Sequence, residues 1–443
     1  MNRFFKKRIE MKKIFLIVII ISFVSINNYS QQNDYVLSLD KAVSLTLQNY
    51  PLIKEAQQRA DVYNSILKEQ KSYYYPNVSA EAAYSRIGPV PAFDLPGMGS
   101  FELFPENNYD AHISVDHNLY DFGKKDAQID LTESIKKSAT DNIELVKSKL
   151  AYATVQTYYS IIFIEKSIAI NDTNVATLNE HINITNKKIE SGTATDYDLL
   201  GTKVNLTKLD SRKIDLQNEL KKQKIILQHL TGLNAEEINV SRSLILHTTD
   251  VNSDSLINVA YQQRAEVKLA NDEEQSSHLK ESLVSYNDLP QLNLHLSYGV
   301  KNGYIPNLDI WRGNWVAGFN LSVPIFNGFR KDYQEEEAKT GTAISESKTE
   351  NIKQQIKEEV NKAVSDIDAN LKQLQTEAVQ VKYAEQLLEK AKVQYTLGVG
   401  TNLDLLDAET RLAEARFSYL KAIYYNILNG YELKKAVGDV IWK

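Results

Sequence analysis

The 443-residue sequence predicts a mixed fold, in which a membrane β-barrel is continued by a long α-helical coiled-coil tunnel. Three observations predict this fold. The chain is an internal two-fold repeat, each repeat contains segments in which apolar and polar residues alternate, and each contains one very long segment without proline. Four strands cannot close a barrel, and an open sheet edge cannot face lipid. We therefore expect a trimer in which each chain supplies four of twelve strands.

Composition excludes several classes of function. The chain has no cysteine, which removes disulfides, cysteine zinc sites, thiol nucleophiles and an N-terminal lipid anchor. Its formal net charge of -6 argues against a nucleic-acid-binding surface. With 43% hydrophobic and 24% charged residues, the composition is not that of a disordered chain.

The N-terminus predicts export. Basic residues precede the apolar run Ile14–Val24, and polar residues follow it. This run is about half the length of roughly 20 residues that a membrane-spanning helix needs, so residues 1–30 are predicted to be a cleaved signal peptide. An uncleaved anchor is the alternative. No later segment has enough consecutive apolar residues for a membrane helix, so any membrane crossing is expected to use β-strands.

Two pairs of segments recur at one offset of 206 residues. Lys188–Thr202 resembles Tyr395–Ala408, and both contain a glycine turn followed by Asp-Leu-Leu. The segment LYDFGK at Leu119–Lys124 corresponds to IFNGFR at Ile325–Arg330. The proline-rich and glycine-rich stretch Pro89–Glu106 is an insertion in the first repeat. A repeat of this length accounts for nearly all of the mature chain.

The repeats divide the chain into a first unit, 31–232, an inter-repeat equatorial segment, 233–253, and a second unit, 254–443. Each unit is expected to run helix, β-hairpin, very long helix, tight turn, helix. The expected elements are a helix over 39–74, β-hairpins over 77–119 and 291–325, long helices over 124–190 and 330–396, and helices over 196–231 and 402–437. The equatorial segment is expected to form a mixed belt around the tunnel, with no role that the sequence assigns.

The predicted strands have one apolar and one polar side. The clearest runs are 9–11 residues long, the length that a tilted membrane-spanning strand needs. Aromatic residues cluster near their ends, as in the interfacial girdle of a membrane barrel; they are Tyr84, Tyr109, Tyr298, Tyr304, Trp311 and Trp315. A soluble sandwich with one solvated face is the alternative that the strands alone leave open.

The long helices predict the tunnel. Each of the two long segments has 67 residues, about 100 Å of helix at 1.5 Å per residue. From Val360 to Tyr395 an apolar residue recurs every seven positions, which indicates supercoiled helices packed side by side. The two shorter helices of a unit have a summed length of about 106 Å, so stacked end to end they match the long one. This match is typical of a tube wall of uniform length.

The residues resemble those of TolC-type outer membrane efflux proteins over essentially the whole mature chain. The resembling segments are Leu37–Ala56, the two strand-to-helix junctions and, most specifically, Leu397–Ala422. The resemblance implies a homotrimeric exit duct that spans the outer membrane, contacts its lipid and extends through the periplasm. It also implies docking onto a periplasmic adaptor and an inner-membrane pump, in a tripartite efflux or type I secretion system. No catalysis, cofactor or metal is implied.

The resemblance places function at the turns between helices. It implies a periplasmic gate formed by Tyr395, Asp404, Asp407 and Asp198, in which rings of carboxylates select for cations. Two positions depart from the family, because Gly400 stands where the family has its gate arginine and Tyr197 replaces a threonine. The adaptor would contact the tip turns, and the residues expected there are Gly192, Leu199, Leu200, Gly398, Leu405 and Leu406.

Simpler roles compete for these residues. A short polar side chain after a glycine turn commonly caps the next helix, and this is the interpretation we favour for Asp196 and Asn402. Asp404 and Asp407 are three residues apart on one helical face, which favours a lining role. The four leucines of the turns suit packing between helices as well as contact with an adaptor.

Other chemistry is weakly represented. No zinc-protease helix motif, serine elbow or paired-carboxylate site is found, and Gly398–Gly400 lacks the third glycine of a nucleotide-binding loop. His112 and His295 suit solvated lumen positions better than metal sites. The alternative function is a soluble periplasmic coiled-coil adaptor or scaffold, which would share the signal peptide and the heptads but would not need the strands. Drug, metal and protein all remain open as exported substrate.

Overall fold

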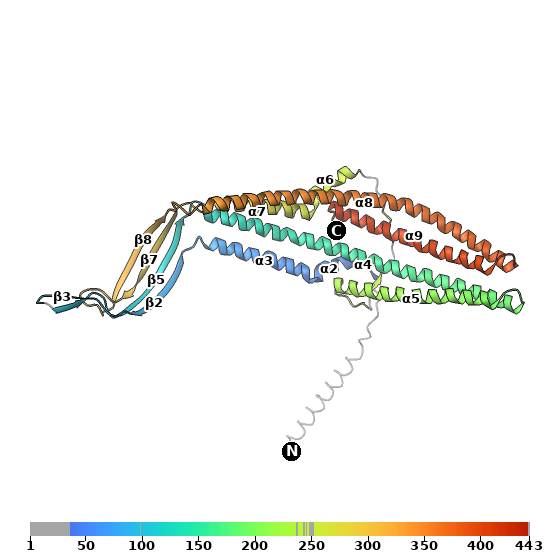
Figure 1. Ribbon diagram of the computed structural model, residues 1–443, viewed down its shortest axis with the longest axis horizontal. Coiled ribbons are helices and arrows are strands. Elements are labelled where there is room, and N and C mark those ends of the chain that lie inside the picture. The colour runs from blue at the N-terminus through green and yellow to red at the C-terminus, as the bar shows by residue number, and fades with distance from the viewer. Residues whose placement is uncertain are drawn as a thin grey trace, which may run out of the picture.

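The computed structural model describes residues 36–441 except 98, 236–237, 242–243, 245 and 248–251. The predicted signal peptide, residues 1–30, lies outside the described residues. The molecule is elongated, with a β-sheet at one end and long helices that run from it to the other end (Figure 1). The helices are α2 (Leu39–Asn49), α3 (Pro51–Ser72), α4 (Lys124–Glu190), α5 (Asp196–Thr231), α6 (Ser253–Gln263), α7 (Ala265–Ser285), α8 (Arg330–Leu397) and α9 (Asn402–Val437).

The main sheet is antiparallel throughout, in the order β2-β5-β7-β8. Its strands are β2 (Asn77–Arg86), β5 (Asn107–Tyr120), β7 (Gln291–Lys301) and β8 (Arg312–Ser322). One side of the sheet is apolar, as the alternation predicts, and the register pairs Tyr298 with Trp315 on it. On the other side the hydroxyls of Ser79 and Ser114 lie 2.8 Å apart. Within the sheet, β2 and β8 are the edge strands.

The insertion in the first repeat forms a second, smaller hairpin that the sequence analysis did not predict. Strands β3 (Ala92–Leu95) and β4 (Gly99–Glu102) pair with each other beyond the far end of the main sheet (Figure 1). Gly97 and Gly99 have φ angles of 86° and 87° around the turn. Glycine adopts this left-handed region without steric cost, so the glycine-rich sequence can reverse direction here.

The junctions between strands and long helices contain two consecutive residues with positive φ angles in both repeats. Phe122 and Gly123 have φ angles of 58° and 95° before α4, and Gly328 and Phe329 have φ angles of 72° and 61° before α8. A phenylalanine in this region is strained. Asp121 offsets part of that cost before α4, because its carboxylate accepts hydrogen bonds from the next turn's backbone at 3.2 Å. At each junction the chain therefore changes direction within two residues.

The predicted single helix over 39–74 is wrong, because two helices, α2 and α3, occupy this segment. Pro51 at the start of α3 has no N–H to donate and disfavours helical geometry in the residue before it. Tyr50 is accordingly extended, with φ -73° and ψ 126°. The second repeat has an equivalent break at Arg264, with φ -66° and ψ 132°, although no proline follows it.

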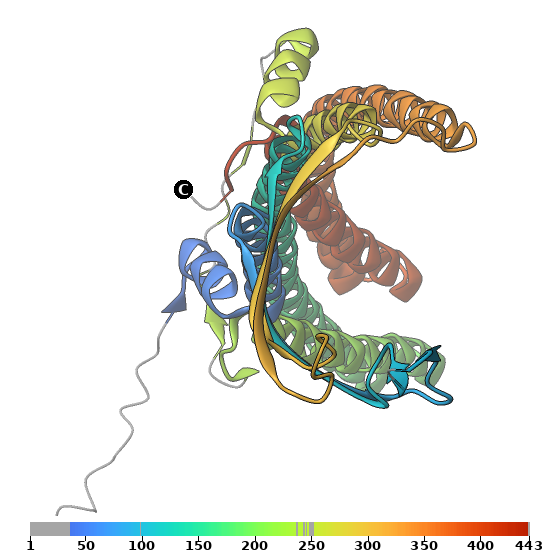
Figure 2. The ribbon, with the colours of Figure 1, turned by 90° about the vertical axis from the view of Figure 1, so that its left-hand side faces the viewer.

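Seen along its long axis, the chain forms an arc (Figure 2). Helices α5 and α8 lie toward the two ends of the arc, and α2 and α6 lie on its convex side. Of the heptad residues predicted to pack, Val360, Ile367 and Tyr395 of α8 are buried, and the three between Ile367 and Tyr395 are half-buried. In the part of the chain that the structure describes, no helix is long and apolar enough to span a membrane.

The described part of the equatorial segment packs on the middle of the helices. Strand β6 (Asn239–Val240) pairs in parallel with β1 (Val36–Leu37) over a core that includes Tyr158 and Ile161 of α4. Further along, the amide side chain of Asn426 on α9 bonds both the backbone N–H and C=O of His247, at 2.8 and 3.1 Å. These contacts attach the segment to α4 and α9.

Candidate functional site

The two helix turns lie together at the end of the molecule farthest from the sheet (Figure 1). The first turn joins α4 to α5, and the second joins α8 to α9. Gly192 and Gly398 have φ angles of 75° and 80°, so each turn uses glycine in the left-handed region to end the long helix. The structure thus brings the predicted gate and tip residues of both repeats to one end.

Each turn is followed by a capping box. Thr195 caps α5: the backbone N–H of Asp198 donates to its hydroxyl at 3.3 Å, and the carboxylate of Asp198 accepts from the Thr195 N–H at 3.0 Å. Thr401 and Asp404 repeat this arrangement at α9, at 3.1 and 2.9 Å. The caps are therefore the threonines, and our assignment of capping to Asp196 and Asn402 is wrong. The spacing of threonine and aspartate is the sequence signal that identifies such a box.

The capping box leads to a stability prediction. Replacing Thr401 with alanine is expected to cost about 1 kcal/mol, because it removes the acceptor for an unpaired N–H of α9. The apparent Tm measures this loss. Thr396→Ala is the matched control, because that hydroxyl bonds only a carbonyl of its own helix. An equal fall in Tm for both variants would contradict the prediction.

The same box has a pH dependence. The hydroxyl and backbone N–H of Thr401 hold the pKa of Asp404 below its ordinary value. Because the folded pKa is lowered, the capping contribution is present at neutral pH and is lost as the pH falls through the folded pKa. The difference in Tm between the parent chain and Thr401→Ala should therefore shrink on acidification.

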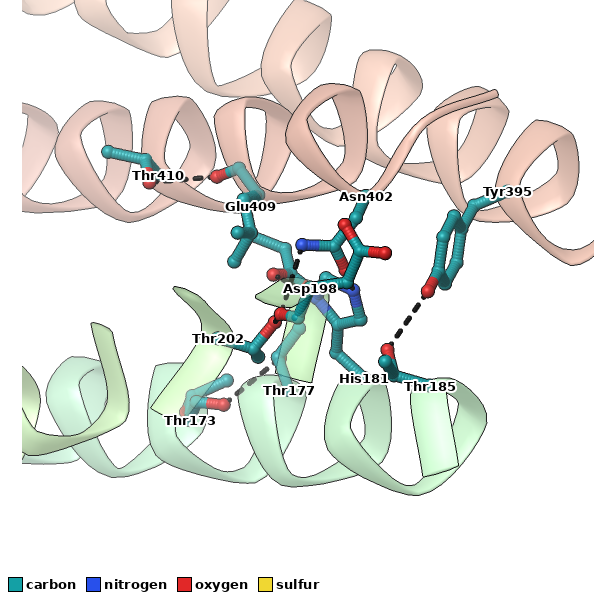
Figure 3. A network of polar contacts seen from close by, with 11 residues as sticks. Thr173, Thr177, His181, Thr185, Asp198, Thr202, Tyr395, Asn402, Glu409 and Thr410 are labelled. Atoms are coloured by element: carbon teal, nitrogen blue, oxygen red, sulfur yellow. Dashed lines mark hydrogen bonds and ion pairs between the residues drawn. The ribbon is translucent and has the colours of Figure 1, made fainter. Parts of the chain in front are cut away.

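A buried polar network joins the helical hairpin of α4 and α5 to the helical hairpin of α8 and α9 near these turns (Figure 3). His181 of α4 is 1% exposed, and its Nδ1 lies 3.0 Å from Oε2 of Glu409 on α9. Its Nε2 lies 2.9 Å from Oδ1 of Asn402. The hydroxyls of Thr185 and Tyr395 are 3.0 Å apart. We call these five residues, His181, Glu409, Asn402, Thr185 and Tyr395, the inter-hairpin clasp.

Tyr395 lies inside this clasp. Its ring is 4% exposed and meets His181 edge to face, with ring centroids 5.3 Å apart. The ammonium of Lys188 lies 5.0 Å from the ring centroid. Burial raises the pKa of the phenol, so it is neutral at physiological pH. Within one chain, Tyr395 therefore links α8 to α4.

The predicted acidic pair is exposed. Asp407 accepts a hydrogen bond of 2.6 Å from Nε of Arg411 one turn later, and both side chains are more than half exposed. Exposed pairs of this kind contribute little to stability. Asp404 is exposed as well, with its carboxylate partly engaged by Thr401. Both carboxylates are therefore accessible to solvent and ions at the end of the helices.

The leucines of the tip divide into buried and exposed positions. Leu405 and Leu406 are 2% and 8% exposed, and Leu405 packs in a small core with Tyr395 and Ala408. Burial suits them for packing between helices. Leu199 is half-buried and Leu200 is exposed.

Four other large apolar residues are exposed at the tip, and the sequence analysis did not predict them as contact residues. They are Tyr197, Leu397, Val399 and Leu403. The sequence does contain a signal for the exposure of Leu397, because this apolar residue falls outside the seven-residue repeat of packed positions that ends at Tyr395. A surface of this kind in a polar setting is typical of a contact site for another protein.

The two histidines predicted to suit lumen positions, His112 and His295, have carboxylate partners. Nδ1 of His112 lies 2.9 Å from Asp110, and Nδ1 of His295 lies 2.7 Å from Asp116, all on the polar side of the sheet. Among the described residues, no group of three or more His, Asp or Glu side chains is arranged to hold a metal ion.

Comparisons with known proteins give the family. The model of the outer membrane efflux protein family matches residues 42–233 and 256–439. The outer membrane protein TolC of Vibrio cholerae is 20% identical over 401 residues, which are 87% of this chain and 91% of that protein. The solved structure of VceC from Vibrio cholerae has a TM-score of 0.77 at 17% identity, over 91% and 96% of the two chains. The CmeC outer membrane channel of Campylobacter jejuni has a TM-score of 0.77 at 18% identity, over 90% and 85%.

These matches confirm the predicted resemblance. The structure has the mostly helical fold of outer membrane efflux channels, with a few strands, and the function is that of an outer membrane channel for efflux. They favour this function over the soluble periplasmic adaptor or scaffold. The family is one of transport channels and not of enzymes. With both repeats matched, the chain belongs to the outer membrane efflux protein family.

Proposed function

We propose that three copies of the chain join edge to edge into a passive exit duct, with a twelve-stranded barrel in the outer membrane and a helical tunnel in the periplasm. The observation that carries this proposal is the sheet, which has one apolar side and two free edges. Strands β2 and β8 run in opposite directions, because neighbouring strands alternate through the order β2-β5-β7-β8. A β8 edge can therefore pair antiparallel with the β2 edge of the next copy and continue the alternation.

The helical layer supports the same arrangement. At one end of the arc, α5 exposes large apolar side chains, among them Val204 and Ile214. At the other end, α8 exposes Ile344 and Tyr383. Two different apolar edges make a head-to-tail interface, which closes into a ring when the rotation between copies permits. The curvature of the arc in Figure 2 suits such a ring.

The apolar side of the sheet is proposed to face lipid. It carries Phe319 and Trp315, which are 73% and 74% exposed in the single chain. At one end the rings of Tyr84, Tyr109 and Trp311 lie next to one another, with centroids 5.1 and 5.3 Å apart. Aromatic rings at the end of an apolar band are typical of the membrane interface.

The end of the tunnel is proposed to be the periplasmic gate. Three copies would bring three pairs of Asp404 and Asp407 carboxylates around one axis, and such rings favour cations. Tyr395 and Asp198 would hold the closed form through their contacts between hairpins. Asp198 takes part through its backbone carbonyl, which accepts a hydrogen bond of 3.3 Å from Asn402.

The partners proposed are a periplasmic adaptor and an inner-membrane pump of a tripartite efflux or type I secretion system. The exposed apolar residues of the tip support an adaptor contact there, at Gly192, Leu200 and Gly398 and at the neighbouring Leu397 and Leu403. Of the predicted contact leucines, three are left out, because Leu199 is half-buried and Leu405 and Leu406 are buried in the single chain. The energy for transport would come from the pump.

Conductance tests this function. Purified protein in planar bilayers should form ion channels, and Asp407→Asn should reduce the preference for cations over anions because three carboxylates are removed from the constriction. The matched control is Asp254→Asn on α6, which lies on the convex side of the arc (Figure 2). The absence of channels would contradict the function. Equal ion selectivity in the parent chain and Asp407→Asn would contradict the gate assignment alone.

A further inference from the structure

The insertion of the first repeat leaves the sheet at one of its two edges. It follows β2, which is an edge strand, and Ile87 is the first residue after that strand. The other edge strand, β8, begins at Arg312, directly after the β7–β8 connection, residues 302–311. When β8 of one copy pairs antiparallel with β2 of the next, the end of β2 at Arg86 meets the start of β8. The chain that leaves β2 therefore lies beside the β7–β8 connection of the neighbouring copy.

Several contacts fix the base of the insertion to its own chain. The N–H of Ile87 donates to the carbonyl of Glu106 at 2.8 Å. The side-chain amide of Asn108 donates to the carbonyl of Pro105 at 2.9 Å. Pro105 is buried and lies beside Gly303 of the same chain, where a Cβ on Gly303 would meet the proline ring at 3.5 Å. The hairpin β3–β4 therefore leaves the sheet from a fixed base.

The hairpin exposes apolar side chains. Phe93 on β3 is 59% exposed, and Ile87 at the base is 45% exposed. A two-stranded hairpin is marginally stable by itself in water, and apolar side chains on its surface favour a covering partner. Seen along the long axis, the hairpin lies at the end of the arc toward which α5 lies (Figure 2). This is the end that the proposed trimer joins to the α8 end of the next copy.

The β7–β8 connection has a surface that matches the hairpin. Ile305 and Ile310 are 70% and 51% exposed there. The basic residues Lys301 and Arg312 flank the connection and outnumber its one acidic residue, Asp309. The insertion contains acidic residues and no lysine or arginine, so the two segments are opposite in charge. We propose that the hairpin β3–β4 packs on the β7–β8 connection of the next copy and joins the copies at the outer rim of the barrel. We call this the rim contact.

A lipid surface is the other partner that exposed aromatic side chains can have. The rings of Tyr84 and Trp311 are proposed to mark the membrane interface at the ends of the strands. The hairpin lies beyond this end of the main sheet (Figure 1). Acidic residues without a balancing lysine or arginine are also repelled by the negatively charged headgroups of a membrane surface. Position and charge therefore both favour the next copy as the partner.

Cross-linking between copies tests the rim contact, and the test rests on the proposed trimer. The chain has no cysteine, so Phe93→Cys and Ile305→Cys together introduce the only two thiols. A short bismaleimide applied to outer membranes should join these two thiols between copies. Denaturing gels should then show products of two and three times the mass of one chain. A link within one chain would leave the mass at that of a single chain and would overturn the rim contact.

The two single variants are the matched controls. Phe93→Cys alone and Ile305→Cys alone place identical thiols a third of a turn apart around the barrel, so neither should give products above the mass of one chain. Products from Phe93→Cys alone would show that the hairpins meet over the barrel axis, which would overturn the rim contact. A native trimer that the double variant fails to cross-link would also overturn it and leave the channel function standing. A native monomer would overturn the proposed trimer itself.

The heat stability of the trimer gives a second readout. Phe93→Ser removes apolar contact area at the rim, so the temperature at which the trimer separates on heat-modifiable gels should fall by several degrees. The matched control is Phe104→Ser, because Phe104 is 55% exposed and lies on the return from β4 to β5, which its own chain holds. No fall for Phe93→Ser, or an equal fall for both variants, would contradict the contact with the next copy.

Discussion

Replacing Phe319 with arginine is expected to abolish assembly in the outer membrane. Phe319 lies on the apolar side of β8, and its side chain is 73% exposed in the single chain, where the proposal places lipid. Arginine on the lipid face near the midplane of a barrel costs about 2–4 kcal/mol per copy, and each trimer would carry three copies. Membrane fractionation followed by heat-modifiable gel mobility measures the loss.

The next residue provides the control. Asn320 lies on the polar side of the same strand, paired in register with Asn293. Asn320→Arg places the same side chain on the side of the sheet proposed to face a water-filled lumen, so it should leave the amount of membrane-inserted protein nearly unchanged. Equal losses for Phe319→Arg and Asn320→Arg would show that the two sides of the sheet do not differ in environment, which would contradict a lipid-facing apolar side.

Truncation of Leu405 is expected to loosen the tip of the tunnel. Leu405 is 2% exposed and packs with Ala391, Tyr395 and Ala408 between α8 and α9. Replacing a buried leucine with alanine costs about 2–5 kcal/mol, because apolar contacts are lost and a cavity remains. The apparent Tm should fall, and conductance at neutral pH should rise because Tyr395 loses a packing partner.

Leu403→Ala is the matched control for Leu405→Ala. Leu403 lies two residues earlier on the same helix and is 73% exposed, so its truncation should change the free energy of unfolding by less than about 0.5 kcal/mol. The adaptor contact proposed for Leu403 gives this variant a separate readout, which is weaker binding of the adaptor. A larger fall in Tm for Leu403→Ala than for Leu405→Ala would contradict the packing described for the tip.

Patterns with a fixed period predicted much of the fold. The alternation in β5 and β7 and the seven-residue spacing through Val360 and Ile367 both place apolar residues on one face. On α8 this face is buried, whereas the apolar side of the sheet is exposed in the single chain. The break between α2 and α3 at Pro51 could be predicted from the sequence, because proline has no N–H to donate. The equivalent break at Arg264 could not be predicted in this way, because no proline or glycine marks it; there the guanidinium bonds Glu266 and Glu359.

The site was harder to predict than the fold. The turn motifs predicted where the tip lies, because glycine ends each long helix and an aspartate shortly after it takes part in the capping box of the next helix. The inter-hairpin clasp could not be found in this way, because His181 and Asn402 are 221 residues apart and no local pattern links them. The spacing of the histidines matches no metal motif, and a single buried histidine between helices gives no local signal. Only the packing of α4 against α9 brings its partners together.

The mass of the species extracted from the outer membrane tests the central claim most directly. Native mass spectrometry of the full chain, expressed with its own N-terminus and extracted in mild detergent, should give three times the mass of one mature chain. That result would agree with a barrel closed by four strands from each of three copies. A monomer or dimer as the native species, or recovery in the soluble periplasmic fraction, would contradict the trimeric duct.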